Sequence, residues 1–320
     1  MHAIVYRKYG GPEVLRYTEV DKPSVGDDGV LVRVHATSIN FGDLAAIHGV
    51  PRIGRLGFGI GRPKKNIPGR AIAGTVEAVG STVTRFRVGD EVLGEMNQRG
   101  FAEYVVAPES HLVTKPAGVT FEQAATLPVA ATTALLLLRG EAGPGRTVLV
   151  NGASGGVGTF AVQVAKVLGA EVTGVCSTRN VELVRSIGAD HVIDYTREDV
   201  TRGTARFDVV VDLVGNHRLA DIRRILVPKG IFLPCSGTGG PVLGPMPRLL
   251  AAILTSPFVS QRLSVRVQTQ NAEDLAYLAG LVESGQITPV IQARYPLSET
   301  AEAIRFLEAD HARGKVVLTV

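Results

Sequence analysis

The sequence predicts a mixed α/β chain in which a β-rich domain is followed by a parallel sheet with helices on both faces. Short runs of β-branched and aromatic residues, bounded by Gly, Pro or Asp, occupy the first 120 or so positions. From about residue 122 onward, apolar strands alternate with segments of helical length. A length of 320 residues also fits about two domains.

The β-rich part is predicted from three strands and the turns between them. The strands are expected at residues 30–36, 74–79 and 101–106, and turn sequences occur at 26–29 and 88–91. We therefore expect residues 1–121 to form a small barrel-like domain.

The second part contains buried strands separated by helical segments, which is the pattern of a parallel sheet. The expected strands are 147–150, 171–175, 191–193, 207–211 and 230–233, with 263–267 as the last strand. Helices are expected at 159–168, 181–187, 272–283 and 299–307, a short strand at 290–291, and a final strand at 315–320.

Composition excludes several classes of protein and of partner. Hydrophobic residues make up 45% of the chain, which excludes a disordered chain, and only two cysteines, Cys176 and Cys235, are present. This cysteine content excludes a disulfide framework and favours a reducing compartment, so a cytoplasmic location is expected. A net charge of +4 with one short basic run, Arg62 to Lys65, argues against a nucleic-acid partner. The longest apolar stretch, 124–138, is shorter than the roughly 20 residues of a membrane span, and no signal peptide is expected at the start.

A glycine-rich stretch between the strand at 147–150 and the helix that follows carries the clearest chemical signal. Aligned to the G-x-G-x-x-G pattern, Ala153 takes the first position, Gly155 the second and Gly158 the third. Such a loop lets the backbone and a helix N-terminus approach a pyrophosphate. We therefore predict dinucleotide binding by Ala153, Ser154, Gly155, Gly156, Val157 and Gly158.

The same loop also satisfies the G-x-S-x-G pattern of α/β-hydrolases, with Ser154 as nucleophile. A hydrolase would need an acid and a histidine later in the chain, and the best available pair is Asp212 and His311. Asp212 ends an apolar strand and His311 lies in a polar turn, so this alternative is the weaker one.

The end of the second strand of the parallel sheet selects the dinucleotide. An acidic residue there would favour NAD, but the chain has Ser177, Thr178, Arg179 and Asn180. A hydroxyl and a guanidinium suit a 2′-phosphate. We therefore predict NADP(H), bound through Ser177 and Arg179.

Motifs along nearly the whole chain, in the expected order, resemble the medium-chain dehydrogenase/reductase superfamily. They occur at residues 75–80, 88–92, 100–104, 127–130, 151–158, 188–193 and 314–317. The resemblance is greatest to the zinc-free quinone-oxidoreductase branch. It implies a GroES-like catalytic domain at 1–121 and 286–320, interrupted by a Rossmann doubly wound parallel-sheet domain at 122–285. It also adds Tyr195 and Lys315 as weaker cofactor-binding candidates.

Zinc-dependent members of that superfamily hold the catalytic metal with two cysteines and a Gly-His-Glu motif. At the corresponding positions this chain has Asn40, Arg70 and Val129, so no catalytic zinc is expected. Without a Lewis acid, alcohol oxidation is disfavoured. The resemblance places Asn40 beside the nicotinamide, where a neutral amide can bond an acceptor oxygen.

Other candidates near Asn40 have ordinary structural alternatives. Asp43 is a second catalytic candidate, although it can equally cap a helix. His48 could donate a proton, although the favoured interpretation is an exposed histidine without a catalytic role. Two segments depart from the family pattern: 56–66, a basic insertion, and 241–262, an apolar stretch expected to cover the substrate site.

These features lead to two hypotheses of different classes. The first is an NADPH-dependent, zinc-free oxidoreductase that transfers hydride to a quinone or an α,β-unsaturated carbonyl. The alternative is a noncatalytic NADPH-binding or sensor protein, because no proton donor is obvious. The resemblance further implies a homodimer that pairs through the edge strand at 263–267, in which Val265→Pro would yield a monomer.

Overall fold

The structure is a computed structural model that describes residues 1–235, 239–309 and 313–320. The chain divides into two compact units. Unit 1 comprises Met1–Thr132, Thr269–Gly285 and Pro289–Val320, and unit 2 comprises Thr133–Gln268 and Gln286–Thr288. Residues 122–132 and 269–285, which the sequence analysis assigns to the second domain, contact unit 1 instead. The assignment of a function to each domain stays a prediction.

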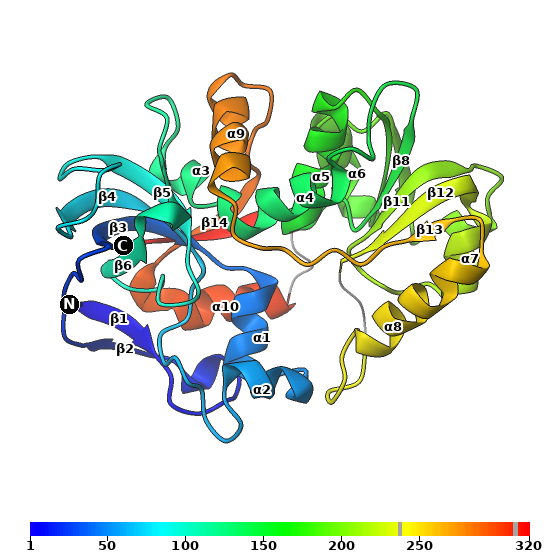
Figure 1. Cartoon of the computed structure of the whole chain (residues 1–320). Helices are drawn as coiled ribbons and strands as arrows, with labels where there is room; N and C mark the ends of the chain where they lie inside the picture. Colours follow the sequence, from blue (N-terminus) through cyan, green and yellow to red (C-terminus); the bar gives the residue numbers. More distant parts are fainter. Residues whose placement is uncertain (236–238, 310–312) are drawn as a thin grey trace. The chain divides into compact units, whose positions relative to one another are not determined.

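Unit 1 is built on a β-sheet with the strand order β14-β15-β3-β4-β5-β7, in which β6 also pairs with β3 (Figure 1). The strands are β3 (Gly29–Ser38), β4 (Ala71–Val79), β5 (Glu91–Glu95), β6 (Tyr104–Pro108), β7 (Leu112–Thr114), β14 (Ile291–Pro296) and β15 (Lys315–Thr319). A separate antiparallel pair is formed by β1 (His2–Val5) and β2 (Arg16–Glu19). The strands expected at 30–36 and 74–79 are therefore confirmed.

Strand β3 is the centre of this sheet and is almost wholly buried. Its first half pairs with β6 and its last residues pair with β15, while β4 runs along its other edge. Val30, Val32 and Val34 pack with Ile72 and Val76 in one core. A buried strand with neighbours on both sides explains why the apolar run is nearly continuous rather than alternating.

The strand expected at 101–106 begins later, at Tyr104. Phe101 is fully buried, and its backbone bonds Pro68 and Ile4 instead of joining the ladder with β3. Packing of a large aromatic ring has thus overridden the local strand pattern.

Unit 1 also contains helices, most of them short. They are α1 (Phe41–His48), α2 (Arg55–Phe58), α3 (Phe121–Ala124), α9 (Ala272–Glu283) and α10 (Thr300–Ala309), with a π-helical turn η4 (Leu127–Ala131). Short 3-10 turns lie at Pro12–Val14, Arg52–Gly54, Glu109–His111 and Leu297–Glu299. The helix predicted at 272–283 is confirmed. The insertion 56–66 forms part of α2 and a loop that Tyr9 anchors, because its hydroxyl donates to Gly59 O at 2.5 Å.

Unit 2 is a parallel sheet with the strand order β10-β9-β8-β11-β12-β13. Figure 1 shows β8, β11 and β12 side by side. The strands are β8 (Thr147–Asn151), β9 (Glu171–Cys176), β10 (His191–Asp194), β11 (Phe207–Asp212), β12 (Leu226–Pro234) and β13 (Arg262–Leu263). The direction of strand addition reverses between β8 and β11, which is the switch point where doubly wound sheets bind ligands. The predicted doubly wound sheet is confirmed.

The helices of unit 2 connect these strands. They are α4 (Thr132–Leu138), α5 (Gly156–Val167), α6 (Val181–Ser186), α7 (Leu219–Arg224) and α8 (Met246–Thr255), with 3-10 turns at Thr178–Asn180, Val200–Arg202 and Ser256–Phe258. By the right-handed rule for crossovers between parallel strands, α5 and α6 are expected on one face of the sheet and α7 on the other. Helix α5 begins three residues earlier than predicted because its N-cap is Gly155.

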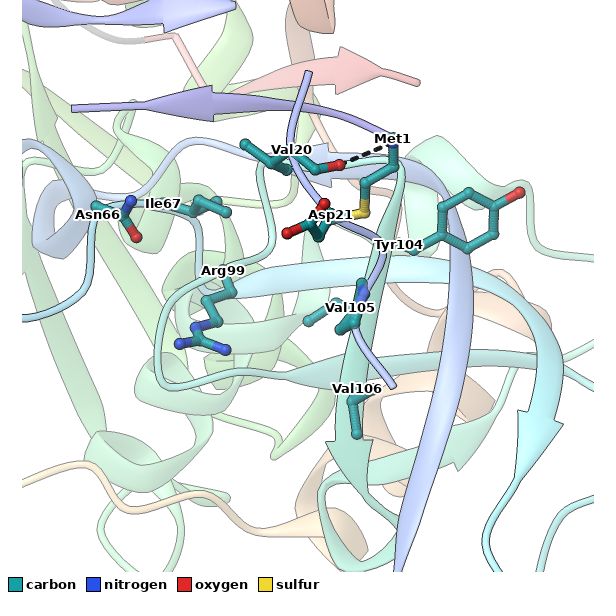
Figure 2. A pocket seen from close by; sticks show the side chains of 10 residues that line it. Met1, Val20, Asp21, Asn66, Ile67, Arg99, Tyr104, Val105 and Val106 are labelled. Carbon is teal, nitrogen blue, oxygen red and sulfur yellow. Dashed lines mark hydrogen bonds between the residues drawn. The ribbon is translucent and has the colours of Figure 1, made fainter. Parts of the chain in front are cut away.

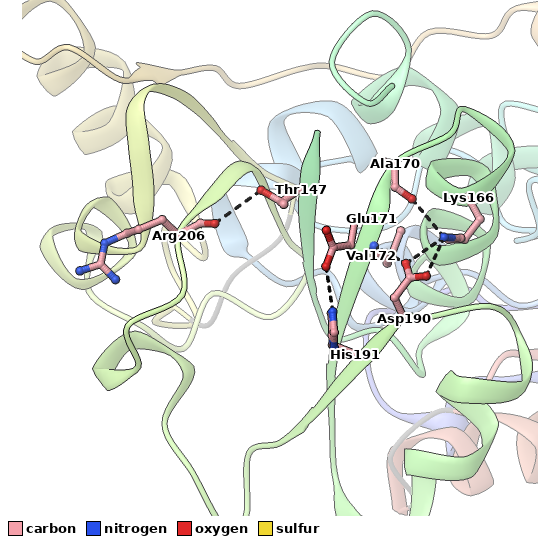
Figure 3. Close-up of polar contacts among 8 residues, drawn as sticks. All are labelled: Thr147, Lys166, Ala170, Glu171, Val172, Asp190, His191 and Arg206. Atoms are coloured by element: carbon pink, nitrogen blue, oxygen red, sulfur yellow. Dashed lines mark hydrogen bonds and ion pairs between the residues drawn. The ribbon is translucent and has the colours of Figure 1, made fainter. Parts of the chain in front are cut away.

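The motif at residues 188–193 joins a helix to two strands (Figure 3). Lys166 Nζ of α5 lies 2.8 Å from each carboxylate oxygen of Asp190, and Asp190 Oδ2 accepts from the Val172 N–H at 2.7 Å. His191 of β10 contacts Glu171 of β9 at 2.8 Å, and Thr147 Oγ1 donates to Arg206 O at 3.5 Å. Asp190 and His191 of this motif therefore connect α5, β9 and β10.

The last strand predicted for this sheet, 263–267, is wrong. Strand β13 spans only Arg262–Leu263, with one further ladder bond from Ser264 N to Phe232 O at 2.9 Å. The chain then leaves the sheet because Arg266 donates to Leu136 O and pairs with Glu141, which also pairs with Arg262. Val265→Pro therefore removes no ladder hydrogen bond in the described structure.

Candidate cofactor and acceptor sites

The glycine loop lies between β8 and α5, at the carboxyl edge of the parallel sheet. The N–H groups of Gly152 and Ala153 both donate to Val175 O, at 3.2 and 3.0 Å, and so tie the loop to the end of β9. Gly152 has a φ of +90°, and a Cβ at Gly158 would lie 2.0 Å from Gly152 O. The loop conformation therefore requires glycine at both positions.

The amino end of α5 is open. Gly155 is its N-cap with extended backbone and no side-chain cap among the described residues. The N–H groups of the first helical turn, from Gly156 to Gly158, have no partner within the helix, and the helix dipole adds positive potential there. A Cβ at Gly155 would meet only Gly152 O, at 3.5 Å. These residues fit a pyrophosphate, which needs exposed backbone donors and close approach.

A buried asparagine that the sequence analysis did not select joins this loop to the end of β9. Asn180 is 1% exposed, and its Nδ2 donates to Ser154 Oγ at 3.0 Å and to Ser177 Oγ at 3.3 Å. Its Oδ1 is buried without a hydrogen-bond partner among the described residues. Asn180 thus holds together two of the predicted cofactor-binding residues. Asn180 could have been recognised from the sequence, because it directly follows Arg179 in the loop predicted to bind the cofactor.

The predicted 2′-phosphate residues lie at the carboxyl ends of β9 and β10. Arg179 is exposed in the turn Thr178–Asn180, and Tyr195 is 48% exposed, with its N–H donating to Cys176 O at 3.0 Å. Asp194, the last residue of β10, accepts from Thr178 Oγ1 at 2.6 Å and from Thr196 Oγ1 at 2.8 Å. The hydrogen bond from Thr178, with those from Thr196, lowers the pKa of Asp194. A carboxylate is therefore present on the neighbouring strand, where its oxygens are bonded to hydroxyl groups.

The hydrolase alternative finds no support in the described residues. Ser154 Oγ accepts from Asn180, and Asp212 is fully buried, accepting from Asn151 Nδ2 at 2.8 Å and from the Gly215 N–H at 2.9 Å. Asp212 also pairs with Arg248. His311, the proposed base, lies outside the described residues. Asp212 is thus part of a structural network rather than a catalytic acid.

Arg248 belongs to α8 and locates the apolar segment 241–262. It pairs with Asp212, the last residue of β11, and donates to His217 O at 2.6 Å. The segment therefore lies at the carboxyl edge of the sheet, as predicted. Leu250, Ile253 and Leu254 of the helix are about half exposed or more. That α8 covers a substrate stays a prediction.

In unit 1, Asn40 and Asp43 lie together at the start of α1. Asn40 is the N-cap of the helix and 6% exposed, and Asp43 is 1% exposed. The Asn40 N–H donates to Asp43 Oδ2 at 2.9 Å, and the Asp43 N–H donates to Asn40 O at 2.9 Å. Asp43 therefore does cap α1, and its catalytic role stays a prediction.

Lys315 joins this cluster from the other end of the sequence. Its side chain is 3% exposed, and its Nζ donates to Ile39 O at 2.9 Å and to Asn40 Oδ1. The sequence indicates Lys315 only as a cofactor-binding candidate and carries no signal for this contact. A direct role of Lys315 in cofactor binding stays a prediction.

Burial shifts the ionisation of both charged members of the cluster. It raises the pKa of Asp43 to about 6, against the opposing effects of the Asn40 N–H, Arg70, Lys315 and a hydrogen bond from the Asn40 side chain. Burial lowers the pKa of Lys315 to about 8, against the opposing effect of Asp43. Near neutral pH the buried ammonium and carboxylate are both charged and stabilise each other.

At the positions where zinc-dependent members of the superfamily have metal ligands, this chain has residues of other types. Arg70 pairs at 2.5 Å with Glu95, whose side chain is 5% exposed, and Arg70 Nη1 lies 3.2 Å from where a Cβ of Gly42 would be. Val129 has a φ of +70° in η4, which is strained for a β-branched residue. The described residues contain no group of three or more His, Cys, Asp or Glu side chains placed to hold a metal. His48 contacts Glu308 of α10 at 2.5 Å.

Unit 1 also has a hollow of about 430 Å³ that none of these residues lines (Figure 2). Its walls are Met1, Val20, Asp21, Pro23, Asn66, Ile67, Arg99, Tyr104, Val105 and Val106. The amino group of Met1 donates to Val20 O at 2.9 Å across one wall. The predicted catalytic residues therefore do not lie in this hollow.

Comparison with known proteins identifies the family. The model for the alcohol dehydrogenase GroES-like domain matches residues 26–117, and that for zinc-binding dehydrogenase matches residues 187–318. The chloroplastic NADPH-dependent alkenal/one oxidoreductase of Arabidopsis thaliana is 35% identical over 99% of this chain and 79% of its own length. A quinone oxidoreductase of Pseudomonas aeruginosa is 35% identical over 98% of both chains. The chain belongs to the medium-chain dehydrogenase/reductase superfamily, in its quinone-oxidoreductase-like branch.

Solved structures agree with this membership. The Escherichia coli quinone oxidoreductase complexed with NADPH superimposes with a TM-score of 0.84 at 27% identity, covering 100% of both chains. The predicted GroES-like and Rossmann domains of this medium-chain dehydrogenase/reductase are thereby confirmed. No described helix of this family member is long and apolar enough to cross a membrane.

Proposed function

We propose that the chain is an NADPH-dependent reductase that transfers hydride to a quinone or an α,β-unsaturated carbonyl compound. The observation that carries the proposal is the open amino end of α5 behind a loop that only glycine can form. The full-length similarity to an NADPH-dependent alkenal/one oxidoreductase and to quinone oxidoreductases supports the acceptor class. NADPH, when bound, supplies the hydride.

The residues divide into those that bind cofactor and those that orient the acceptor. Ala153 to Gly158 receive the pyrophosphate, while Ser177 and Arg179, with Tyr195 nearby, receive the 2′-phosphate. Ser154 and Ser177 are held in place by Asn180. Asn40 bonds the acceptor oxygen, and Asp43 holds the Asn40 backbone at the start of α1.

We further propose that the reaction needs no zinc. Asn40, Arg70 and Val129 offer an amide, a guanidinium engaged with Glu95, and an aliphatic side chain, none of which is a preferred zinc ligand. Reduction of a conjugated acceptor needs an oriented nicotinamide and a proton rather than a Lewis acid.

The test is steady-state oxidation of NADPH with a panel of quinones and enones, run with and without a chelator. We expect turnover on at least one acceptor class, with rates unchanged by the chelator and no stoichiometric zinc by elemental analysis. Tight NADPH binding with no turnover on any acceptor would favour the noncatalytic sensor. Activity lost in chelator and restored by zinc would contradict the zinc-free proposal.

A homodimer and a cytoplasmic location complete the proposal. Because β13 is only two residues long, extended strand pairing at Val265 is not supported. The exposed apolar residues beside β13, Leu254, Phe258 and Val267, support an interface there instead. Free Cys176 and Cys235 agree with a reducing compartment. Light scattering at micromolar concentration should give the mass of a dimer, and a monomer would reject this assembly.

A further inference from the structure

The insertion 56–66, which neither candidate site uses, is a closed and anchored loop. It begins in α2, which Figure 1 shows next to α1. The Lys64 N–H donates to Phe58 O at 2.7 Å and closes the loop. Lys65 anchors the far end, because its Nζ donates to Asn97 O at 2.5 Å. The insertion therefore has a defined conformation that hydrogen bonds maintain.

The outer turn of this loop carries two exposed aliphatic side chains. Leu56 is 69% exposed and Ile60 is 77% exposed. A Cβ at Gly57 or at Gly61 would meet nothing within 4 Å, so the backbone beside each aliphatic residue is uncovered as well. We call these four residues the apolar tip. Single exposed aliphatic residues are common on protein surfaces, but two on one uncovered turn indicate contact with a partner.

Cations accompany the apolar tip, and no acidic residue is near it in the sequence. The chain contains no Asp or Glu between Asp43 and Glu77. Arg52, Arg62 and Lys64 are exposed, and none of the three forms an ion pair within the described ranges of the chain. Their charges are therefore available to an anionic partner.

Arg99 adds a further cation from a second segment of unit 1. Its side chain is exposed, and its N–H donates to Ile67 O at 3.0 Å, which ties it to the end of the insertion. Burial and the nearby charge of Arg99 lower the pKa of Lys65. Like charges lie close together here, and a bound anion would relieve their repulsion.

This combination fits the surface of an anionic bilayer better than a protein or a nucleic acid. Half of the residues from 54 to 61 are glycine, so the loop offers few side chains for a shape-complementary protein interface. Nucleic-acid phosphates would pair with the cations but leave the apolar tip in water. A bilayer needs no fixed shape, because binding depends on the apolar area inserted and on attraction to anionic headgroups.

We propose that the insertion 56–66 docks unit 1 on the surface of an anionic lipid bilayer, with Leu56 and Ile60 in the headgroup region. Arg52, Arg62 and Lys64 pair with the lipid phosphates. Such docking requires no membrane-spanning helix. The cytoplasmic leaflet is the anionic one, which agrees with the proposed cytoplasmic location. Quinones with long apolar tails dissolve in bilayers, so docking brings the enzyme to acceptors of the proposed class.

The first experiment is co-sedimentation of the full chain with vesicles. One set is phosphatidylcholine alone, and the other contains about 30% phosphatidylglycerol, an anionic lipid. We expect the partition coefficient to be at least about tenfold higher on the anionic vesicles, and to be lost in high salt, which screens the cations. No binding to the anionic vesicles, or equal binding to both sets, would overturn the inference.

The cations are tested by the double variant Arg62→Gln/Lys64→Gln. Its matched control is Arg87→Gln/Arg202→Gln, which lowers the net charge equally but removes exposed arginines that each pair at 3.5 Å with an aspartate three positions away. We expect partition to anionic vesicles to fall about 10- to 30-fold in the loop variant and less than about threefold in the control. Equal losses would assign the binding to net charge and overturn the role of the loop.

The apolar tip is tested by Leu56→Ser against Val88→Ser. Val88 is 65% exposed, so each variant removes one exposed aliphatic side chain. We expect partition to fall about five- to tenfold in Leu56→Ser and less than about twofold in Val88→Ser. NADPH affinity and thermal unfolding should be unchanged in both, because both positions lie on the surface. Full vesicle binding by Leu56→Ser would overturn the insertion of the tip.

The outcome can be separated from that of the proposed function, because vesicle binding requires no turnover. Docking that depends on the loop in a protein that reduces no acceptor would reject the proposed function and keep this inference. In an active enzyme, Arg62→Gln/Lys64→Gln should reduce a long-tailed quinone held in anionic vesicles about tenfold more slowly, with an unchanged rate on a water-soluble quinone. Equal losses on both quinones would contradict docking as the cause.

Discussion

The two candidate sites are built from different parts of the polypeptide. The cofactor site of unit 2 is made mainly of backbone, because Gly152 and Gly158 shape the loop that leads into the open amino end of α5. The acceptor site of unit 1 is made of side chains, in which Asn40 meets Lys315 from 275 residues away. A backbone site is encoded within a few consecutive residues, whereas a side-chain site exists only once the sheet has formed.

This difference also predicts how each site fails. A backbone site should be destroyed by a single added carbon atom, because the glycine conformation leaves no room for it. A side-chain site should keep its shape when one group is changed and lose its orientation or its charge balance instead.

Gly158→Ala should abolish NADPH binding. The added Cβ would lie 2.0 Å from Gly152 O, a backbone atom that cannot move without opening the loop. We expect NADPH affinity to fall by at least about 100-fold, measured by fluorescence titration, because the pyrophosphate loses its aligned donors. Gly143→Ala is the control, since a Cβ there meets nothing within 4 Å. Near-normal NADPH binding by Gly158→Ala would show that the loop does not form the cofactor site.

The sequence predicted most of the fold because its signals were local. Alternating buried strands and helices gave the parallel sheet, and the glycine pattern located the loop. The wrong predictions concern the ends of two strands, which are determined by contacts with residues far away in the sequence. The strand expected at 263–267 ended early because Arg266 reaches Leu136 and Glu141. The strand expected at 101–106 began late because Phe101 packs in another core.

The candidate sites show the same limit. The residues of the glycine loop could be named from the sequence and lie together in the structure. The contact between Asn40 and Lys315 could not, because it depends on the register of β3 with β15. Asn180 was overlooked because its importance lies in the two serines that its amide joins, Ser154 and Ser177.

Asp43→Asn should change how stability depends on pH. The folded carboxyl has a pKa of about 6, above its ordinary value of 3.8, so the folded state binds a proton more tightly than the unfolded chain. The stabilisation of the folded state by the protonated Asp43 carboxyl is therefore fully present below about pH 4. It is lost as the pH rises through 6. We expect wild-type stability relative to Asp43→Asn to fall by on the order of 2–3 kcal/mol between pH 4 and pH 7, measured by urea unfolding.

Asp190 of unit 2 is a control, because its pKa is shifted in the opposite direction to that of Asp43. Although partial burial works against it, hydrogen bonds from Lys166 and the Val172 N–H lower the pKa of Asp190. Wild-type stability relative to Asp190→Asn should therefore rise with pH over the acid range. If both variants gave the same slope, Asp43 would not be the raised carboxyl.

Arg179→Ala should weaken NADPH binding about tenfold and leave NADH nearly unchanged, since only the 2′-phosphate loses a charged partner. Binding of each cofactor can be followed by fluorescence. Arg185→Ala is the control, because Arg185 is exposed and pairs with Glu182 on α6. Equal losses for both cofactors would contradict the assignment of Arg179 to the 2′-phosphate.

We propose that the chain carries hydride from NADPH to a conjugated acceptor. Its most direct test is to supply NADPH with deuterium in both C4 positions together with the best enone, and to analyse the product by mass spectrometry and NMR. The account predicts one deuterium per product molecule, at the carbon β to the carbonyl. A product without deuterium, or NADPH that stays unoxidised with every acceptor, would contradict it.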